Sequence, residues 1–237
     1  MSRRRQRPPA RGAWRAIGLI VVLIGAGVVA DRLAPAQDLP WKPFSLNRPI
    51  GWATHVQLAA IGYDAPRCEA ALAEGGVAFT PAEPQRAGDC HVLNGVRLGE
   101  GVVPLKPAAP VMSCQEALAF ADWTRHAVQP AAQSVYGARV VEIEHFGTYA
   151  CRPIRGHAHG LSEHAFADAI DVSAFRLSDD RLISVLRSYR DQGPDGVFLR
   201  RVHDRACQVF GHALGPDFNA DHKDHFHLDM GLWGPCR

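Results

Sequence analysis

The most distinct pattern along the chain is an unbroken apolar run over residues 16–30, preceded by six arginines within residues 1–15. A membrane-spanning helix needs about 20 apolar residues, and Trp14 and Leu33 extend the run toward that length. Basic flanks stay on the cytoplasmic side of a membrane, so the arginines place the rest of the chain on the outer side. The pattern therefore predicts a basic cytoplasmic tail and an exported domain.

Two interpretations of the apolar segment remain open. One is an uncleaved anchor over residues 16–36, which makes the chain a single-pass membrane protein with its domain on the outer side. The other is a signal peptide cleaved at the small-x-small sequence Ala34-Pro35-Ala36. We favour the anchor, because a proline at that position makes a poor cleavage site.

The chain beyond this segment is predicted to form a linker and one domain. Residues 37–49 are rich in proline, which is typical of a semi-rigid spacer, and we expect them to hold the domain off the bilayer. Residues 50–237 are numerous enough to build a single hydrophobic core.

Periodicity within the domain predicts helices mixed with short strands. Helical spacing of apolar residues covers residues 50–76, 115–137, 182–189 and 198–214. Gly75-Gly76 ends the first of these helices, and Pro130 marks a possible break in the second. Short strand-like stretches lie within residues 77–112 and at 140–143, 169–172 and 225–230. This mixture favours an α+β fold with a small antiparallel sheet flanked by helices.

Charge is distributed unevenly along the chain. Six of the 26 basic residues lie in residues 1–15, which hold no acidic residue, so the other 20 face 24 acidic residues and the body is net −4. A mildly acidic body without a basic stripe argues against a nucleic-acid partner.

All six cysteines follow the apolar segment, and the chain contains no CxxC pair. An even number of cysteines in an exported chain predicts disulfides rather than a cysteine-based zinc finger. Six cysteines allow 15 pairings, and the sequence does not choose among them. Some of them can alternatively be buried small apolar residues.

Candidate catalytic and metal-binding residues are concentrated in two histidine-containing stretches, residues 162–171 and residues 221–229. In the second, the strand expected over residues 225–230 places His225, His227 and Asp229 on one face and Phe226 and Leu228 on the other. Imidazole and carboxylate are the usual nitrogen and oxygen ligands of Zn²⁺, so the polar face indicates a metal site. The alternative is a solvated strand face.

The first stretch strengthens the metal interpretation. His164 on a loop and Asp171 on the following strand can converge on one ion together with His227. Three protein ligands and an open position are typical of a catalytic zinc site, whereas four protein ligands close a structural one. We therefore expect a mononuclear Zn²⁺ site with these three ligands.

These stretches resemble known families. The spacing Ser162-x-His164-x-x-Ala167-x-Ala169-x-Asp171, followed by His225-Phe226-His227, is similar to the motifs of the LAS zinc metallopeptidases, the lysostaphin and D-Ala-D-Ala-peptidase group. The phrases LSEHAFADAIDVSAF, FLRRVHDRAC and LGPDFNADHKDHFHLDMG more closely resemble the bacterial extensin-like C-terminal domain family, over about residues 40–237. The resemblance implies His164, Asp171 and His227 as zinc ligands.

The same resemblance suggests catalytic roles for three further residues. Gly147 to Arg152 is similar to a GYR segment, which implies that Arg152 contacts substrate or a developing oxyanion. The group often uses an acid three residues before the last ligand, which here is Asp224, and some relatives use a histidine, here His225. Asp224 reaches the site only if the chain bends near Lys223. One departure is Ala167, where the motif has glycine.

Neighbouring polar residues are weaker site candidates. His157 and His159 are expected in an exposed loop rather than in a second metal pair, and His222 either lines the site or lies on the surface. We expect Glu163 to point to solvent, and Asp168 to be solvated or paired with an arginine.

His203 and His212 fall on the helix predicted over residues 198–214, and we expect both on a helix face or at the edge of the core.

The residues predict a hydrolytic zinc site, with Asp224 or His225 as base and Arg152 as anion contact. The resemblance and the topology together imply that the chain is anchored in the bacterial inner membrane, with its domain in the periplasm, and acts on peptide (amide) bonds of peptidoglycan. Two alternatives remain. The first is a metal-stabilised cell-wall binding module without turnover, and the second is a disulfide-stapled envelope protein without metal.

Overall fold

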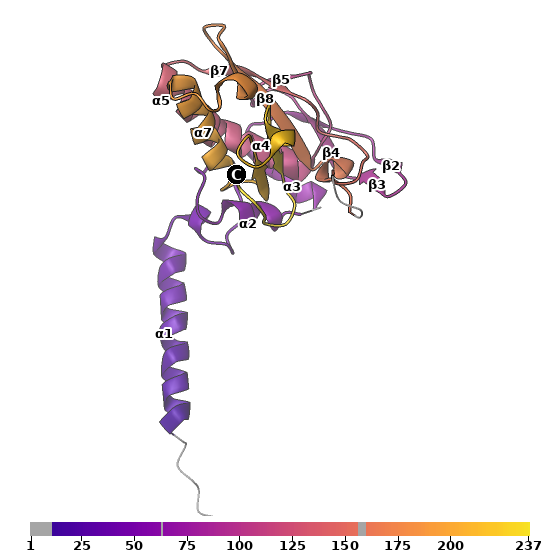
Figure 1. The fold of residues 1–237 in the computed structure, drawn as a ribbon. Coiled ribbons are helices and arrows are strands. Elements are labelled where there is room, and N and C mark those ends of the chain that lie inside the picture. The colour runs from indigo at the N-terminus through magenta and orange to yellow at the C-terminus, as the bar shows by residue number, and fades with distance from the viewer. Residues whose placement is uncertain (1–10, 63, 156–159) are drawn as a thin grey trace, which may run out of the picture.

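The computed structural model describes residues 11–62, 64–155 and 160–237. Most of the basic tail, residues 1–10, and the pair His157 and His159 lie outside the described residues. One long helix projects from a mixed α+β domain (Figure 1).

The projecting helix α1 spans Arg11–Leu33 and is long and apolar enough to cross a membrane. It lies near the N-terminus, as an anchor or a signal sequence would. The helix extends beyond both ends of the apolar run, because the flanking residues continue its backbone hydrogen bonds as far as Ala34.

The segment after α1 is folded onto the domain, which contradicts the spacer expected over residues 37–49. A short 3-10 helix covers Ala36–Asp38, and Leu39 and Leu46 are buried. The Gln57 side-chain amide donates to the carbonyls of Ala36 and Leu39, at 2.7 Å each. Apolar residues between the prolines can be buried in the domain, and this burial outweighs the tendency of a proline-rich stretch to extend.

The site-bearing sheet has the strand order β10-β11-β8-β7-β5, with β9 paired to β8. Its strands are β5 (Leu105–Lys106), β7 (Val140–His145), β8 (Ala169–Leu177), β9 (Leu182–Ser184), β10 (His212–Leu214) and β11 (Phe226–Asp229). All neighbours are antiparallel except β5 and β7. The α+β fold with a mainly antiparallel sheet is thus confirmed.

Smaller sheets and helices surround this sheet. The remaining strands are β1 (Phe79–Pro81), β2 (Gln85–Ala87), β3 (Cys90–Val92), β4 (Gly95–Leu98) and β6 (Met112–Ser113). The helices before them are α2 (Thr54–Ala59) and α3 (Ala65–Glu74), and α3 ends at Gly75 as expected. The helices after them are α4 (Cys114–Trp123), α5 (Gln129–Tyr136), α6 (Val185–Ser188) and α7 (Pro194–Ala206).

Helices α4 and α5 are joined by a π-helical segment, Thr124–Val128, into the long helix that the periodicity predicts. Pro130 lies inside this continuous helix without ending it, directly after the π-helical turn in which the Gln129 amide bonds to the Thr124 carbonyl, five residues earlier. Gly137 ends the helix in the left-handed conformation, with φ 65°.

Three predicted helices are wrong in part. The helix predicted over residues 50–76 is interrupted between α2 and α3. Residues 182–189 form β9 and only a short α6, and the helix predicted over residues 198–214 ends at Ala206 and is followed by β10. At Gly211 the chain passes against the backbone of Gly231, and an added Cβ would lie 2.0 Å from the Gly231 carbonyl oxygen. This close approach brings the following residues beside β11, with which they pair as β10. The periodicity of the sequence does not reveal such a contact between distant residues.

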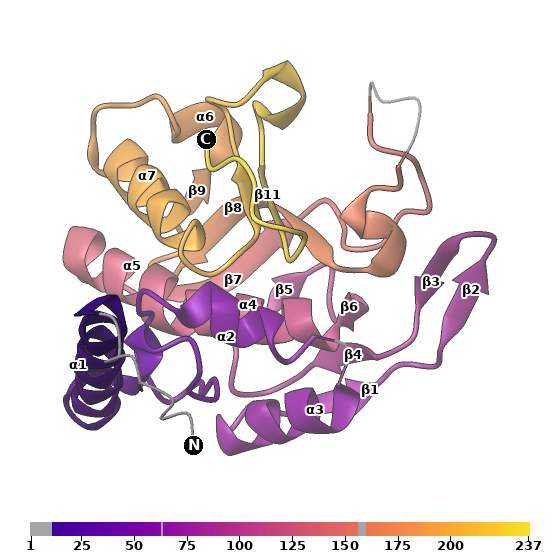
Figure 2. The same cartoon turned by 90° about the horizontal axis from the view of Figure 1, so that it is seen from below.

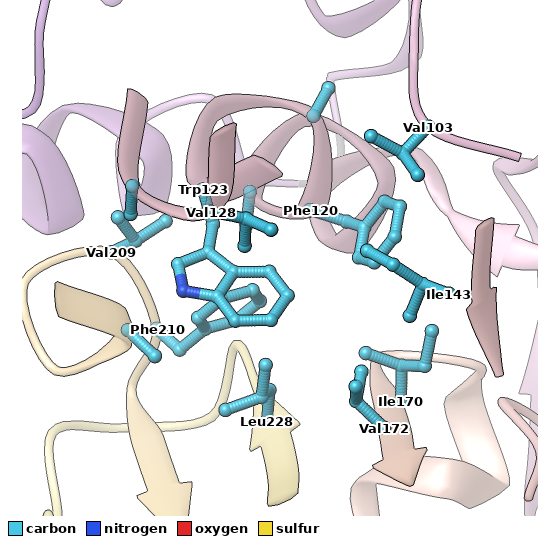
Figure 3. Close-up of a cluster of buried hydrophobic side chains, with 14 of the residues drawn as sticks. Val103, Phe120, Trp123, Val128, Ile143, Ile170, Val172, Val209, Phe210 and Leu228 are labelled. Carbon is cyan, nitrogen blue, oxygen red and sulfur yellow. The ribbon is translucent and has the colours of Figure 1, made fainter. Parts of the chain in front are cut away.

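The core lies between α4 and the sheet. Figure 3 shows Trp123 and Phe120 of this helix facing Ile143, Ile170 and Leu228 of the strands. The Trp123 indole nitrogen donates to the Val202 carbonyl at 2.8 Å and so ties α4 to α7. Seen from below, α2, α4 and α5 lie on one side of β7 and β8 (Figure 2).

The six cysteines form three disulfides: Cys68–Cys114, Cys90–Cys151 and Cys207–Cys236. The first joins α3 to α4. The second ties β3 to the segment that precedes the site, and the third holds the C-terminus beside the end of α7. The prediction that the cysteines form disulfides is confirmed, and the structure supplies the pairing that the sequence left open.

Candidate metal centre

Two paired strands carry the centre. Strands β8 and β11 pair antiparallel, with Asp171 directly opposite His227. Phe226 and Leu228 are fully buried on the other face of β11. The alternation expected for this strand is therefore present, and it presents His227 toward Asp171.

A third residue reaches the pair from a short 3-10 helix, Glu163–Phe166. Nε2 of His164 lies 3.2 Å from Oδ1 of Asp171 and 3.2 Å from Nδ1 of His227, and the last two atoms are 2.9 Å apart. His164 is buried and the other two are half-buried. Three residues from two strands and a loop thus point one ligand atom each at a common point.

The donor set and its spacing fit a zinc ion. Two ligands bound at 2.0–2.1 Å with a tetrahedral angle lie about 3.3 Å apart, close to the three separations observed. Two imidazole nitrogens and one carboxylate oxygen are ordinary zinc ligands. Among the described residues the structure thus contains a candidate metal group made of His164, Asp171 and His227.

The outer nitrogens of both histidines are fixed by hydrogen bonds. Nδ1 of His164 donates to the Thr148 carbonyl at 3.2 Å, and Nε2 of His227 donates to Oδ2 of Asp229 at 2.8 Å. Each bond places the proton on the outer nitrogen and leaves the inner one free to bind a cation. This is the outer-shell arrangement usual around zinc-binding histidines.

Asp229 is itself held by two further donors. Its Oδ1 accepts from Nδ1 of His212 at 2.7 Å and from the backbone amide of Gly231 at 2.9 Å. Burial alone would raise the pKa of Asp229, but the hydrogen bonds from His212 and His227 outweigh it and lower that pKa. Asp229 therefore stays ionised behind the centre.

Two carboxylates, those of Asp171 and Asp229, flank the imidazole of His227. Burial works to raise the pKa of Asp171, yet the hydrogen bonds from His164 and His227 lower it. Burial works to lower the pKa of His227, but the carboxylates of Asp171 and Asp229 on either side raise it to about 9. Without a metal, His227 thus carries a second proton between the carboxylates of Asp171 and Asp229.

Asp224 and His225 lie in the bend before β11, so the bend required near Lys223 is present. Nδ1 of His225 donates to Oδ1 of Asp224 at 2.9 Å, and its Nε2 lies 3.5 Å from Oδ1 of Asp171. His225 thus faces the ligands, and Asp224 contacts its far side. The two candidate bases, Asp224 and His225, are thus hydrogen-bonded to each other.

A cavity of about 450 Å³ opens over the centre. Arg152, Glu163 and His222 line it beside the histidines. The structure therefore brings Arg152 to the site, and His222 is a site residue rather than a surface one. Glu163 does not simply point to solvent: it is half-buried, and its burial raises its pKa.

Two further expectations are wrong. Asp168 is buried, and its Oδ1 accepts from the hydroxyl of Ser113 at 2.5 Å, which satisfies that oxygen inside the domain. Burial raises the pKa of Asp168 to about 7. His212 lies on β10 and contacts Asp229, so it supports the centre. His203 lies on α7 as expected, but it is fully inside the core, where its Nε2 donates to the Ala213 carbonyl.

Ala167 is the residue at which the sequence departs from the glycine of the motif that it resembles. It is buried and adopts the left-handed conformation, with φ 55° and ψ 28°. Alanine accepts this conformation at a cost of about 1–2 kcal/mol. Ala167 thus provides, without glycine, the left-handed residue that follows the 3-10 helix Glu163–Phe166.

Comparison with protein families gives one decisive match. The model of the family described as "Extensin-like protein C-terminus" matches residues 66–237. The chain belongs to this family. The extensin-like match includes every residue of the centre and all six cysteines, and it begins within α3, later than the resemblance expected from about residue 40. Curated proteins and solved structures give no significant match.

Proposed function

We propose that this extensin-like protein is a membrane-anchored, zinc-dependent hydrolase of amide bonds in the peptide part of peptidoglycan. The observation that carries the proposal is the joint placement of the three ligand atoms and the Asp224–His225 pair at one cavity. In this proposal α1 is the anchor, the basic tail is cytoplasmic, and residues 50–237 form the periplasmic domain.

His164, Asp171 and His227 would hold the ion. Zn²⁺ held by three protein ligands supplies a water whose pKa is near 7 and a Lewis acid for a carbonyl. His225 lies outside the group of mutually close ligand atoms, although its Nε2 is near Asp171. We therefore assign His225 to proton transfer rather than to metal binding.

His225 is suited to act as the general base. Its Nδ1 proton is engaged by Asp224, which leaves Nε2 unprotonated and directed at the centre. Asp224 then orients the imidazole and stabilises it when it becomes charged. Arg152, on the cavity wall, offers a planar guanidinium to a substrate carboxylate or to a developing oxyanion.

The substrate class is supported by two features. The motifs resemble those of the LAS peptidases, and an N-terminal basic and apolar segment directs the domain toward the cell envelope. Peptidoglycan is the amide-rich polymer that a domain tethered at that location meets.

The test uses the purified full chain in detergent, incubated with peptidoglycan in the presence of zinc or of chelator. We expect new amino termini only with zinc, and none with His227→Ala. Binding of peptidoglycan without cleavage would contradict the hydrolase and favour the non-catalytic module.

The base is identified by a matched pair of variants with unchanged ligands. We expect His225→Ala to lower kcat by about 10²–10⁴-fold and Asp224→Asn to lower it less, with zinc content retained in both. A larger loss in Asp224→Asn than in His225→Ala would make Asp224 the base.

A further inference from the structure

The segment that follows α1 turns back along it. Nε1 of Trp41 donates to Oδ1 of Asp31 at 2.9 Å, and Lys42 pairs with the same carboxylate at 2.5 Å. Trp41 also lines a cavity with Ile24 and Val28 of α1. Since α1 rises about 1.5 Å per residue, this contact lies roughly 8–14 Å below the end of the helix at Leu33. The segment between α1 and α2, here called the connection, therefore holds the domain close to the apolar part of α1.

Large apolar side chains are exposed at the same end of the domain. The interfacial patch consists of Trp41, Trp52, Leu232 and Trp233, which are 58%, 82%, 91% and 67% exposed. The backbone amide of Trp52 donates to Oδ1 of Asp38 at 2.7 Å, so Trp52 is fixed beside the segment after α1. Trp233 stacks on His55 of α2, with ring centroids 5.4 Å apart. The patch thus spans the connection, α2 and the C-terminal loop.

The position of α2 agrees with this placement. Figure 1 shows α2 at the end of the domain from which α1 projects, and Figure 2, the view from below, shows α2 lying over α4 with α1 to one side of it. If α1 crosses a membrane, the patch faces the surface of that membrane.

We propose that the interfacial patch rests in the outer interface of the bilayer that α1 crosses. Tryptophan is favoured at that depth, because its ring is apolar and its N–H remains hydrogen-bonded. The occupant is lipid rather than another protein, because the patch is continuous with the anchor through Trp41 and the chain between them is folded. The inference rests on the proposed anchor but not on hydrolase activity.

The test is ¹⁹F NMR of the full chain carrying 5-fluorotryptophan, in nanodiscs of phosphatidylethanolamine and phosphatidylglycerol with a spin label on a fraction of the headgroups. The five tryptophans give five signals, which single Trp→Phe variants assign. We expect Trp52 and Trp233 to broaden as strongly as Trp14, which lies in α1, and Trp123 in the core to broaden least.

Three results would overturn the inference, and they are distinguishable. If the Trp14 signal broadens while the signals of Trp52 and Trp233 stay as sharp as that of Trp123, α1 is in the membrane but the interfacial patch does not contact the lipid. A sharp Trp14 signal would remove the anchor and the inference together. Signals of Trp52 and Trp233 that respond to protein concentration but not to labelled lipid would assign the patch to a second copy of the chain.

Discussion

Asp229→Asn is expected to weaken zinc binding although Asp229 is not a predicted ligand. Its Oδ2 accepts the Nε2 proton of His227, while Oδ1 accepts from His212 and Gly231. An amide nitrogen in place of Oδ2 faces that proton and favours the tautomer with the proton on Nδ1, the nitrogen that points to the metal. If the new side chain at position 229 is turned by 180°, its amide nitrogen instead faces the two donors His212 Nδ1 and the Gly231 backbone amide.

The expected size follows from these bonds. A hydrogen bond to a charged group contributes about 1.5–3 kcal/mol, and loss of such an outer-shell partner weakens metal binding about 10–100-fold. The measurement is zinc affinity by competition with a chelating dye, on the purified full chain. Asp221→Asn is the matched control, because Asp221 also lines the cavity but pairs with Arg155. An affinity of Asp229→Asn within twofold of the parent chain would refute the tautomer argument.

Two further predictions concern stability. Burial raises the pKa of Asp122 to about 8, and its oxygens have no hydrogen-bond partner among the described residues. The folded chain therefore holds a proton that the unfolded chain loses above pH 4, so stability falls as pH rises from about 4 to 8. The free energy of unfolding is measured in urea at pH 5 and at pH 8. In Asp122→Asn its decrease between these two pH values should be smaller than in the parent chain by up to about 4 kcal/mol, and an equal decrease in both chains would contradict the raised pKa of Asp122. Replacing both Cys90 and Cys151 by serine opens a loop with a sequence separation of 61 and should lower the free energy of unfolding by about 2–4 kcal/mol, because the disulfide restricts the unfolded chain; a loss below about 1 kcal/mol would contradict this argument.

Local patterns predicted the parts of the centre that depend on a single element. The two-residue alternation of β11 places His227 and Asp229 on one face. The long helix from α4 to α5 and the apolar helix α1 also follow from periodicity and composition. These features need no knowledge of what packs against them.

The parts that the sequence did not predict depend on contacts between distant segments. His212 belongs to the centre only because Gly211 lets the chain pass Gly231 and pair β10 with β11. The buried Oδ1 of Asp168 is satisfied by Ser113, 55 residues earlier, which donates to it. The connection after α1 folds because Gln57 binds its carbonyls. The only signal in the sequence was a pair of glycines, Gly211 before β10 and Gly231 after β11. The sequence does not show that these two glycines lie against each other.

Zinc stoichiometry tests the three-ligand centre most directly. The full chain is saturated with zinc, freed of loosely bound metal and analysed for metal content, with circular dichroism to verify the fold. We predict one zinc per chain, lost in His227→Ala and in Asp171→Ala and retained in Asp221→Asn. A folded parent chain that holds no zinc, or a folded His227→Ala chain that holds as much as the parent, would contradict the centre.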